Sequence, residues 1–283
     1  MKICVAGLGL IGGSLCMALK RAGYGVDGWN RSDKALAYAI ENKIVDGKAD
    51  DFKNYDLVFV ALPVEATLKF IDDTPFKDGA IVCDICGVKK SVADAVYAKG
   101  RNFSYVGCHP MAGKEVSGIE NACADLFDRA SMVITHDSRT DKKALDTVRK
   151  ITKDMGFARI VECSAEVHDK KIAYTSQLAH IVANAYVKDK EIEGCIGFTG
   201  GSFQDMTRIA GVDENIWASL YLENSENLSE KIENIITSLQ TVKCAIDDRD
   251  RQKLAEVLRE GRLSFESGKT TLPPEGVTVI KLK

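Results

Sequence analysis

The first part of the chain alternates short apolar runs with longer amphipathic stretches. Apolar residues at helical spacing predict helices over 12–22, 33–42, 64–73, 89–99 and 141–155. The runs that predict strands are KICVAG (2–7), GVDGWN (25–30), DLVFVAL (56–62), AIVCDI (80–85), SYVGCH (104–109), SMVITH (131–136) and ARIVEC (158–163). This alternation is typical of an α/β fold in which crossover helices join parallel strands.

From Ser164 onward the pattern becomes helical, so we expect strands to end near Cys163 and two domains, 1–163 and 164–283. Helices are predicted within 165–190, 213–223, 225–247 and 250–267. The stretch 225–247 carries one apolar stripe, made of Leu228, Ile232, Ile235, Ile236, Leu239, Val242 and Ala245. Such a stripe is either the core of a small all-helical domain or an interface between two copies of the chain, and both interpretations stay open.

Composition narrows the class of partner. The 283 residues carry a net charge of −3, which gives no electrostatic reason to expect nucleic acid or a membrane surface. The first residues lack the basic leader and long apolar run of a secretory signal or membrane span. We therefore expect a cytoplasmic protein with a small-molecule substrate.

Nine cysteines, an odd number, favour free thiols over a disulfide framework. Cys83 and Cys86 form one C-x-x-C inside an apolar run. A single pair lacks the second pair of a zinc site, so packed thiols are favoured over a metal or redox role, and no metal is expected.

A glycine motif opens the chain. Gly7, Gly9 and Gly12 form G-x-G-x-x-G directly after the first predicted strand. Leu8, Leu10 and Ile11 fill the positions between them. Glycines at these places allow a tight turn, close approach of a pyrophosphate and close packing of helix on strand, while the helix N-terminus donates N–H groups to phosphate. The motif predicts a Rossmann-like dinucleotide-binding domain.

The end of the second predicted strand bears on the choice of coenzyme. Asn30 occupies the place where an acid would bind a ribose 2′-hydroxyl, and Arg31 and Ser32 follow it. An arginine and a hydroxyl suit a 2′-phosphate, which a carboxylate would repel, so NADP is favoured over NAD. The alternative, in which Asn30 binds an unphosphorylated ribose and Arg31 is a surface charge, stays open.

Three further segments, taken with the glycine loop, resemble the prephenate, arogenate and cyclohexadienyl dehydrogenases of tyrosine biosynthesis. They are GCHPMAGKEVSGIENACADLF (107–127), HDKKIAYTSQLAH (168–180) and GGSFQDMTRIAGVDENIW (200–217). The resemblance covers nearly the whole chain. It implies a dinucleotide-binding domain followed by a helical dimerisation domain, with the active site in the cleft between them. It also implies oxidation of a cyclohexadienol by NAD(P) with loss of carbon dioxide.

The resemblance assigns roles to five residues. His109, at the end of a predicted strand and held extended by Pro110, matches the catalytic histidine that takes the proton of the ring hydroxyl. Arg208 matches an arginine that binds substrate carboxylate, and His180 matches a second histidine that contacts substrate. Glu115 matches an acid near the cleft, whose role is either to hold Arg208 or to help gate substrate entry. Lys89 is expected to add positive charge near substrate or cofactor.

The chain departs from the family pattern at two positions. Gly87 stands where many members carry a serine, and Gln177 stands where many carry a further histidine. His136 and His168 are given no catalytic role, because the first follows a strand and the second stands at a helix start beside Asp169. The choice between prephenate and arogenate, and any inhibition by tyrosine, stay open.

Two rival functions are weighed. A β-hydroxyacid dehydrogenase would need a lysine followed four positions later by an asparagine, but Lys171 is followed at that spacing by Thr175. A non-catalytic dinucleotide sensor would need neither His109 nor Arg208. We expect an enzyme, an NAD(P)-dependent prephenate dehydrogenase that forms homodimers through its C-terminal helices.

Overall fold

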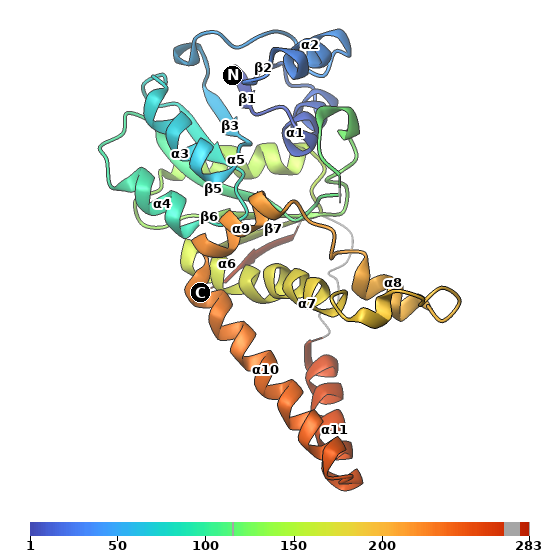
Figure 1. The fold of residues 1–283 in the computed structure, drawn as a ribbon. Helices are drawn as coiled ribbons and strands as arrows, with labels where there is room; N and C mark the ends of the chain where they lie inside the picture. Colours follow the sequence, from blue (N-terminus) through green and yellow to red (C-terminus); the bar gives the residue numbers. More distant parts are fainter. Residues whose placement is uncertain (115, 269–277, 283) are drawn as a thin grey trace.

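The described residues of a computed structural model, 1–114, 116–268 and 278–282, form one twisted sheet followed by helices (Figure 1). The sheet has the strand order β2-β1-β3-β4-β5-β6-β7-β8. Its strands are β1 (Ile3–Ala6), β2 (Val26–Trp29), β3 (Leu57–Val60), β4 (Ile81–Asp84), β5 (Ser104–Pro110), β6 (Ser131–Thr135), β7 (Arg159–Cys163) and β8 (Thr278–Lys281). The seven strands predicted from the sequence are confirmed.

Helices alternate with the strands up to β7 and then follow one another. The helices between strands are α1 (Leu10–Arg21), α2 (Asp33–Glu41), α3 (Val64–Asp73), α4 (Lys90–Tyr97) and α5 (Lys142–Asp154). Those after β7 are α6 (Ala165–Ile172), α7 (Leu178–Tyr186), α8 (Gly201–Thr207), α9 (Glu214–Glu223), α10 (Ser225–Asp247) and α11 (Arg251–Gly268), with a π-helical turn at Ala173–Gln177 that joins α6 to α7. The predicted sequence of a Rossmann-like domain followed by helices is confirmed.

Each strand of the sheet divides its side chains between two apolar cores, because successive residues of a strand point to opposite faces. In β1, Ile3 and Val5 pack in the core that also contains Leu15 and Leu19 of α1. Cys4 and Ala6 pack in the opposite core, with the side chains of α3 and α4. The sheet is therefore covered on both faces, as its nearly continuous apolar strands require.

The prediction of an all-parallel sheet is wrong at one place. β5 and β6 pair antiparallel, whereas the other neighbouring strands pair parallel. Between β5 and β6 the described residues contain only a short 3-10 turn, Ile119–Asn121, and no crossover helix. The chain thus stays at the carboxyl edge of β5, and the next strand has to run back.

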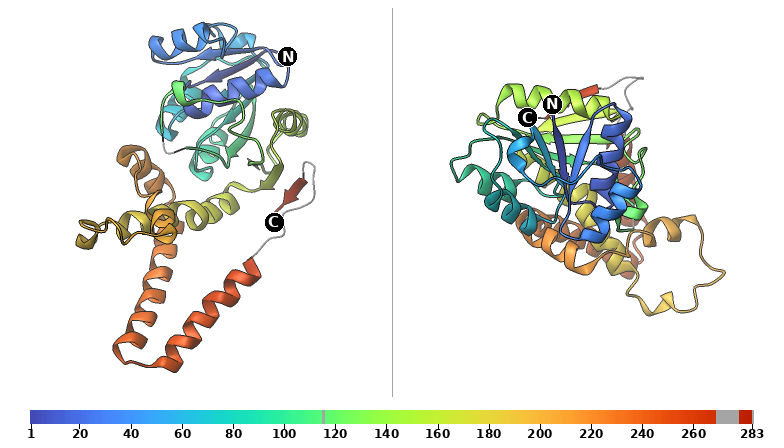
Figure 2. Two further views of the ribbon diagram at one scale, coloured as in Figure 1. Left: turned by 90° about the vertical axis from the view of Figure 1, so that its right-hand side faces the viewer. Right: turned by 90° about the horizontal axis from the view of Figure 1, so that it is seen from above.

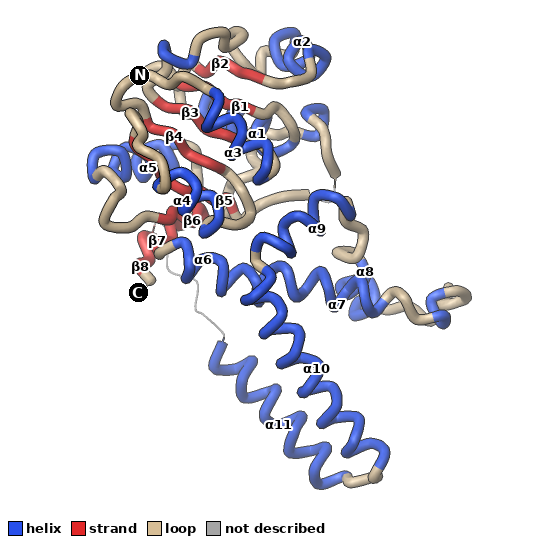
Figure 3. The backbone as a smooth tube through the Cα atoms, turned by 60° about the vertical axis from the view of Figure 1, so that its left-hand side comes forward, coloured by secondary structure: helices blue, strands red, loops and turns tan. Residues whose placement is uncertain are grey.

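The expectation that strands end near Cys163 is also wrong. β8 pairs parallel to β7 and adds an eighth strand to the sheet of the first domain (Figure 3). Its last residues are tied to Glu162, whose carbonyl accepts from Leu282 N at 2.8 Å. β8 has only four residues and a single apolar pair, so its hydrophobic pattern does not distinguish a strand from an irregular C-terminal segment.

α6 begins directly after β7, capped by the Ser164 hydroxyl, which accepts from Val167 N at 3.3 Å. α10 and α11 form a long antiparallel hairpin that stands away from the sheet (Figure 2). Of the stripe predicted on α10, only Leu228 and Ala245 are buried, and Leu239 is 62% exposed. No helix among the described residues is long and apolar enough to span a bilayer.

Candidate active site

The glycine loop has the geometry that its sequence predicts. Gly7 has φ +99°, a backbone conformation that side chains disfavour, and an added Cβ would lie 2.3 Å from the Ala61 carbonyl oxygen. A Cβ at Gly12 would lie 1.7 Å from the carbonyl oxygen of Gly7. At Gly9 no atom lies within 4 Å of such a Cβ, so open space borders the N-terminus of α1. These residues fit a bound pyrophosphate.

The side chains between the glycines serve the fold. Leu8 and Leu10 are 2% and 7% exposed, and Ile11 packs at the edge of the core, so only the backbone of these residues is turned towards the open space. Asn30 braces the loop from the end of β2, because its Oδ1 accepts from Leu8 N at 2.9 Å.

The residues after Asn30 are exposed, so their side chains can contact a bound nucleotide. The Asn30 amide also donates to the Ser32 carbonyl at 3.3 Å, which turns the chain after the strand. Arg31 and Ser32 are exposed. In the part of the chain that the structure describes, the Arg31 guanidinium has no ion pair or hydrogen bond.

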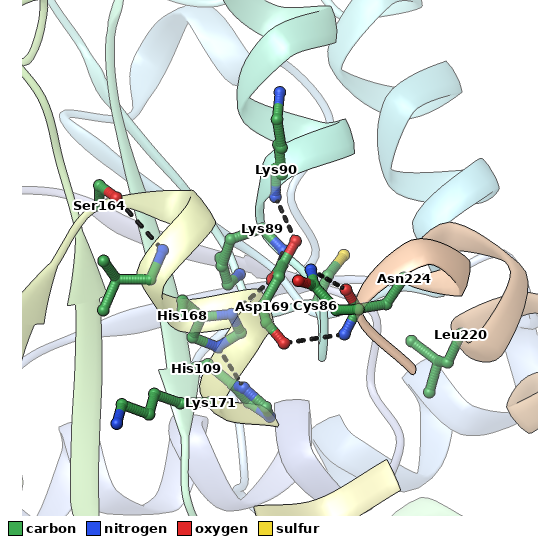
Figure 4. A network of polar contacts seen from close by, with 12 residues as sticks. Cys86, Lys89, Lys90, His109, Ser164, His168, Asp169, Lys171, Leu220 and Asn224 are labelled. Atoms are coloured by element: carbon green, nitrogen blue, oxygen red, sulfur yellow. Dashed lines mark hydrogen bonds and ion pairs between the residues drawn. The ribbon is translucent and has the colours of Figure 1, made fainter. Parts of the chain in front are cut away.

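His109 lies near the carboxyl end of β5 and contacts a second histidine (Figure 4). Its Nδ1 is 2.8 Å from Nε2 of His168, on α6. Burial, His168 and Lys89 hold the pKa of His109 well below its ordinary value, so the imidazole is neutral at pH 7. Among the described residues no partner bonds to its Nε2, which leaves that nitrogen for a ligand.

His168 is in turn bound by the next residue. Its Nδ1 is 2.7 Å from Oδ1 of Asp169, and both side chains are almost fully buried. Burial lowers the pKa of His168, although Asp169 acts in the opposite direction. The Asp169 carboxylate also accepts from Lys89 N at 2.8 Å and Lys90 N at 2.9 Å, so it joins α6 to the start of α4.

Lys89 lies beside this cluster in a buried ion pair. Its Nζ contacts Oδ1 of Asp84, and both side chains have no exposed surface. The same carboxylate accepts from the Tyr105 hydroxyl at 2.6 Å and from Cys86 N at 2.9 Å. The position supports a structural role for the ammonium, and the contact with substrate expected for Lys89 stays a prediction.

Two substrate residues expected from the sequence lie next to each other on the helical side. Nδ1 of His180 donates to the Ile209 carbonyl at 2.8 Å, directly after Arg208 at the end of α8. The His180 ring packs against Trp217 of α9 at a tilt of 45°, with centroids 4.0 Å apart. With Nδ1 as the donor, Nε2 of His180 is the nitrogen available to accept. Glu115, the third residue expected here, lies outside the described residues.

α9 connects this group to His109. A Cβ added at Gly87 would lie 3.4 Å from Leu220 of α9 and 4.0 Å from Cε1 of His109. Trp217, which holds His180, lies one turn before Leu220 on the same helix. The space that a serine hydroxyl would fill is therefore bordered by the imidazole and by α9.

Gln177, the other departure from the family pattern, is 2% exposed. Its Nε2 donates to the Leu220 carbonyl at 3.1 Å, and its Oε1 accepts from Asn224 at 2.7 Å. Asn224 donates to the Asp169 carbonyl as well, at 2.9 Å. Gln177 thus joins the π-helical turn to the α9–α10 junction.

Sequence reasoning left His168 and Asp169 out of the site. The signal was present in the sequence, because an imidazole and a carboxylate stand side by side at the start of the helix that directly follows β7. What the sequence did not reveal is that α6 brings His168 against the end of β5. His136, also given no role, lies 3.6 Å from Glu162.

The C-x-x-C pair has no metal-binding geometry. Cys83 and Cys86 are buried free thiols, and burial raises the pKa of Cys86 to about 12. Its Sγ lies 3.4 Å from the Thr67 hydroxyl. Within the described ranges no cluster of histidine, cysteine or acidic side chains could hold a metal ion. Both thiols are packed in the core, and the absence of a metal or redox role stays a prediction.

The glycine loop, the sheet edge beside it and the neutral imidazole define a dinucleotide-dependent dehydrogenase. Residues 15–162 match the family model described as the prephenate dehydrogenase nucleotide-binding domain, and residues 164–260 match that of the prephenate dehydrogenase dimerization domain. The chain therefore belongs to the prephenate dehydrogenase family.

Individual relatives agree with this assignment. The chain is 30% identical over 267 residues to a prephenate dehydrogenase of Bacillus subtilis, covering 89% of this chain and 72% of the relative. It is 30% identical over 274 residues to a cyclohexadienyl dehydrogenase of Zymomonas mobilis, covering 92% and 93%. The solved structure of A. aeolicus prephenate dehydrogenase with hydroxyphenyl propionate and NAD+ matches with a TM-score of 0.82 at 29% identity, covering 95% of this chain and 98% of that one.

Proposed function

We propose that this chain catalyses the NAD(P)-dependent oxidative decarboxylation of prephenate to 4-hydroxyphenylpyruvate. The observation that carries the proposal is the neutral imidazole of His109, with one nitrogen held by His168 and the other without a partner among the described residues. It stands at the same carboxyl edge of the parallel strands as the glycine loop, where open α/β sheets bind their ligands.

The chemistry requires one proton acceptor. His109 takes the proton of the ring hydroxyl as the carbon that bears it acquires carbonyl character. The bound dinucleotide supplies the acceptor for the hydride that leaves this carbon. The electron pair of the bond to the departing carbon dioxide enters the ring, and His109 returns its proton to the resulting phenolate oxygen. The imidazole of His109 is then neutral again.

The substrate carries two carboxylates, so the site needs groups that bind anions. Arg208 is proposed to bind one carboxylate through its planar guanidinium, and Nε2 of His180 is proposed to face the substrate beside it. Glu115 is proposed to hold Arg208 or to help gate substrate entry, and Lys89 is proposed to contribute positive charge. The contact through Ile209 that places His180 beside Arg208 supports the first two assignments.

NADP is proposed over NAD as the coenzyme. Arg31 and Ser32 are exposed directly after Asn30, which stands where a carboxylate would repel a 2′-phosphate. Gly7, Leu8, Gly9, Leu10, Ile11 and Gly12 are proposed to hold the pyrophosphate through their backbone.

A homodimer is proposed, with its interface on α10 and α11. The hairpin leaves large apolar side chains exposed: Leu239 is 62% exposed, Leu258 62% and Leu263 50%. The proposed domain boundary lies between Cys163 and Ser164, where α6 begins. Free thiols throughout the described chain support the cytoplasm as the proposed compartment.

The test is a two-by-two assay of prephenate and arogenate with NAD+ and NADP+, which follows nicotinamide reduction and identifies the aromatic product. We expect turnover of prephenate, with the higher kcat/KM for NADP+. Turnover of arogenate alone would contradict the proposed substrate. Failure of both substrates with both coenzymes would contradict the enzymatic function.

A further inference from the structure

His109, His168 and Asp169 form a continuous row of polar contacts that leads inward from the proposed base (Figure 4). Nδ1 of His109 is 2.8 Å from Nε2 of His168, and Nδ1 of His168 is 2.7 Å from Oδ1 of Asp169. His168 and Asp169 are each 2% exposed, so solvent does not compete for these contacts. The chemistry of Asp169, at the buried end of the row, therefore determines which nitrogen donates in each hydrogen bond.

Asp169 sets that direction. A carboxylate only accepts hydrogen bonds, and this one already accepts from the backbone N–H groups of Lys89 and Lys90. Nδ1 of His168 must then carry the hydrogen. A neutral imidazole has one donor and one acceptor nitrogen, so Nε2 of His168 is the acceptor. Nδ1 of His109 in turn carries its hydrogen, and the lone pair of His109 is on Nε2.

We propose that His168 and Asp169 are positioning residues that fix His109 in the tautomer whose Nε2 accepts the substrate's proton. This inference rests on the proposed function, because it names the atom at which the base acts. When His109 is protonated, its Nδ1–H bond to His168 becomes charge-assisted, and the Asp169 carboxylate balances the new charge. The other charged groups near the row, Lys89 and Asp84, already neutralise each other in their buried pair.

A purely structural alternative exists, since Asp169 also joins α6 to the start of α4 through the two backbone N–H groups. In that case the loss of His168 would alter stability without changing the protonation pattern of His109. The two roles therefore differ in a spectroscopic property of the free enzyme.

The experiment uses the 283-residue chain labelled with 15N in histidine, and reads the tautomer of each ring from its nitrogen shifts in the absence of substrate. The chain has only four histidines, so His109→Asn, His168→Phe and His136→Asn assign them. We expect His109 and His168 both protonated at Nδ1. Replacement of Asp169 by Asn should mix the His168 tautomers, and His168→Phe should mix those of His109. A wild-type His109 protonated at Nε2 would overturn the proposal.

Kinetics supply the second readout. His168→Phe removes the acceptor and should lower kcat by about tenfold or more with little change in KM or in nucleotide Kd. His168→Gln retains a side-chain oxygen that can accept, and should recover part of the loss. His136→Asn, which lies outside the row, is the matched control. Equal kcat in wild type and in a folded His168→Phe variant would overturn the proposal.

The outcomes separate this inference from the proposed function. If His109 and His168 are both protonated at Nδ1 but the protein does not oxidise prephenate, the positioning proposal is supported and the proposed function is contradicted. If the protein oxidises prephenate but the His109 tautomer is unchanged in His168→Phe, the positioning proposal is contradicted and the proposed function is supported.

Discussion

Gly9 and Gly12 have different reasons to be glycine. The sequence motif predicts both, but only the structure separates them. A methyl group at Gly12 would collide with the backbone of Gly7, whereas a methyl at Gly9 would enter the open space at the start of α1. The fold therefore requires Gly12, and the bound dinucleotide requires Gly9.

Substitution of each glycine by alanine tests this distinction. Gly12→Ala should lower the melting temperature by several degrees and weaken nucleotide binding, because helix and loop must separate. Gly9→Ala should leave the melting temperature unchanged but weaken NAD(P)+ binding, since the methyl occupies space meant for phosphate. Thermal unfolding and calorimetric titration measure both effects. A destabilised Gly9→Ala variant would contradict the assignment.

The two coupled histidines predict how stability depends on pH. The pKa values of His109 and His168 are lowered in the folded state, so the unfolded chain binds more protons below about pH 6.5. Their contribution is therefore present above that pH and is lost as the pH falls, by about 1.4 kcal/mol per pH unit for each histidine. Carboxyl groups with lowered pKa, such as Glu162, act only at lower pH.

Urea unfolding at about pH 7 and about pH 5.5 checks this sign. Wild type should lose stability over the interval, and His168→Phe should lose less of it. Stability that rises as the pH falls through this interval would contradict the burial of neutral imidazoles.

At the scale of strands and helices, the hydrophobic period and the length of each run determined which elements the sequence could predict. The seven runs from KICVAG to ARIVEC are short and mostly apolar, and they are confirmed as strands. The reversal of β6 was not predicted, because the direction of a strand depends on whether a crossover helix precedes it, which the apolar pattern of the strand itself does not reveal. β8 was missed because its four residues acquire their role only by pairing with β7.

The buried pair at the start of α4 allows a test at this level. Lys89→Met leaves the Asp84 charge buried without its partner, and should lower the free energy of unfolding by about 3–5 kcal/mol. The double variant Asp84→Asn, Lys89→Met should recover most of that loss. Its KM for prephenate then reports on Lys89: a raised KM supports the predicted contact with substrate, and an unchanged KM contradicts it.

Removal of β8 tests what the last strand contributes. A chain that ends at Gly268 loses the pairing with β7 and the bond from Leu282 to Glu162, which together should lower the free energy of unfolding by about 2 kcal/mol. Arg149 still binds Glu162 at 2.5 Å in that variant, so the buried carboxylate keeps a partner. Urea unfolding measures the change, and an unaltered midpoint would show that the strand adds no stability.

At the scale of the whole molecule, the sequence predicted the two domains and the residues at the ends of single strands. It did not predict which side chains the helical part brings to them. His109 was predicted because a strand places it at the sheet edge, whereas His168 contacts it from a helix far along the chain. Leu220 and Gln177 contact each other beside the site, also from the helical part. Contacts of this kind depend on packing between domains, which no local pattern encodes.

The rate of nicotinamide reduction with prephenate, compared between wild type and His109→Asn, tests the central claim most directly. Both proteins should show the same circular dichroism and the same nucleotide Kd, because His109 lies outside the glycine loop. Loss of the base should lower kcat by about 10²- to 10⁴-fold. Equal rates in the two proteins would contradict the assignment of His109 as the proton acceptor.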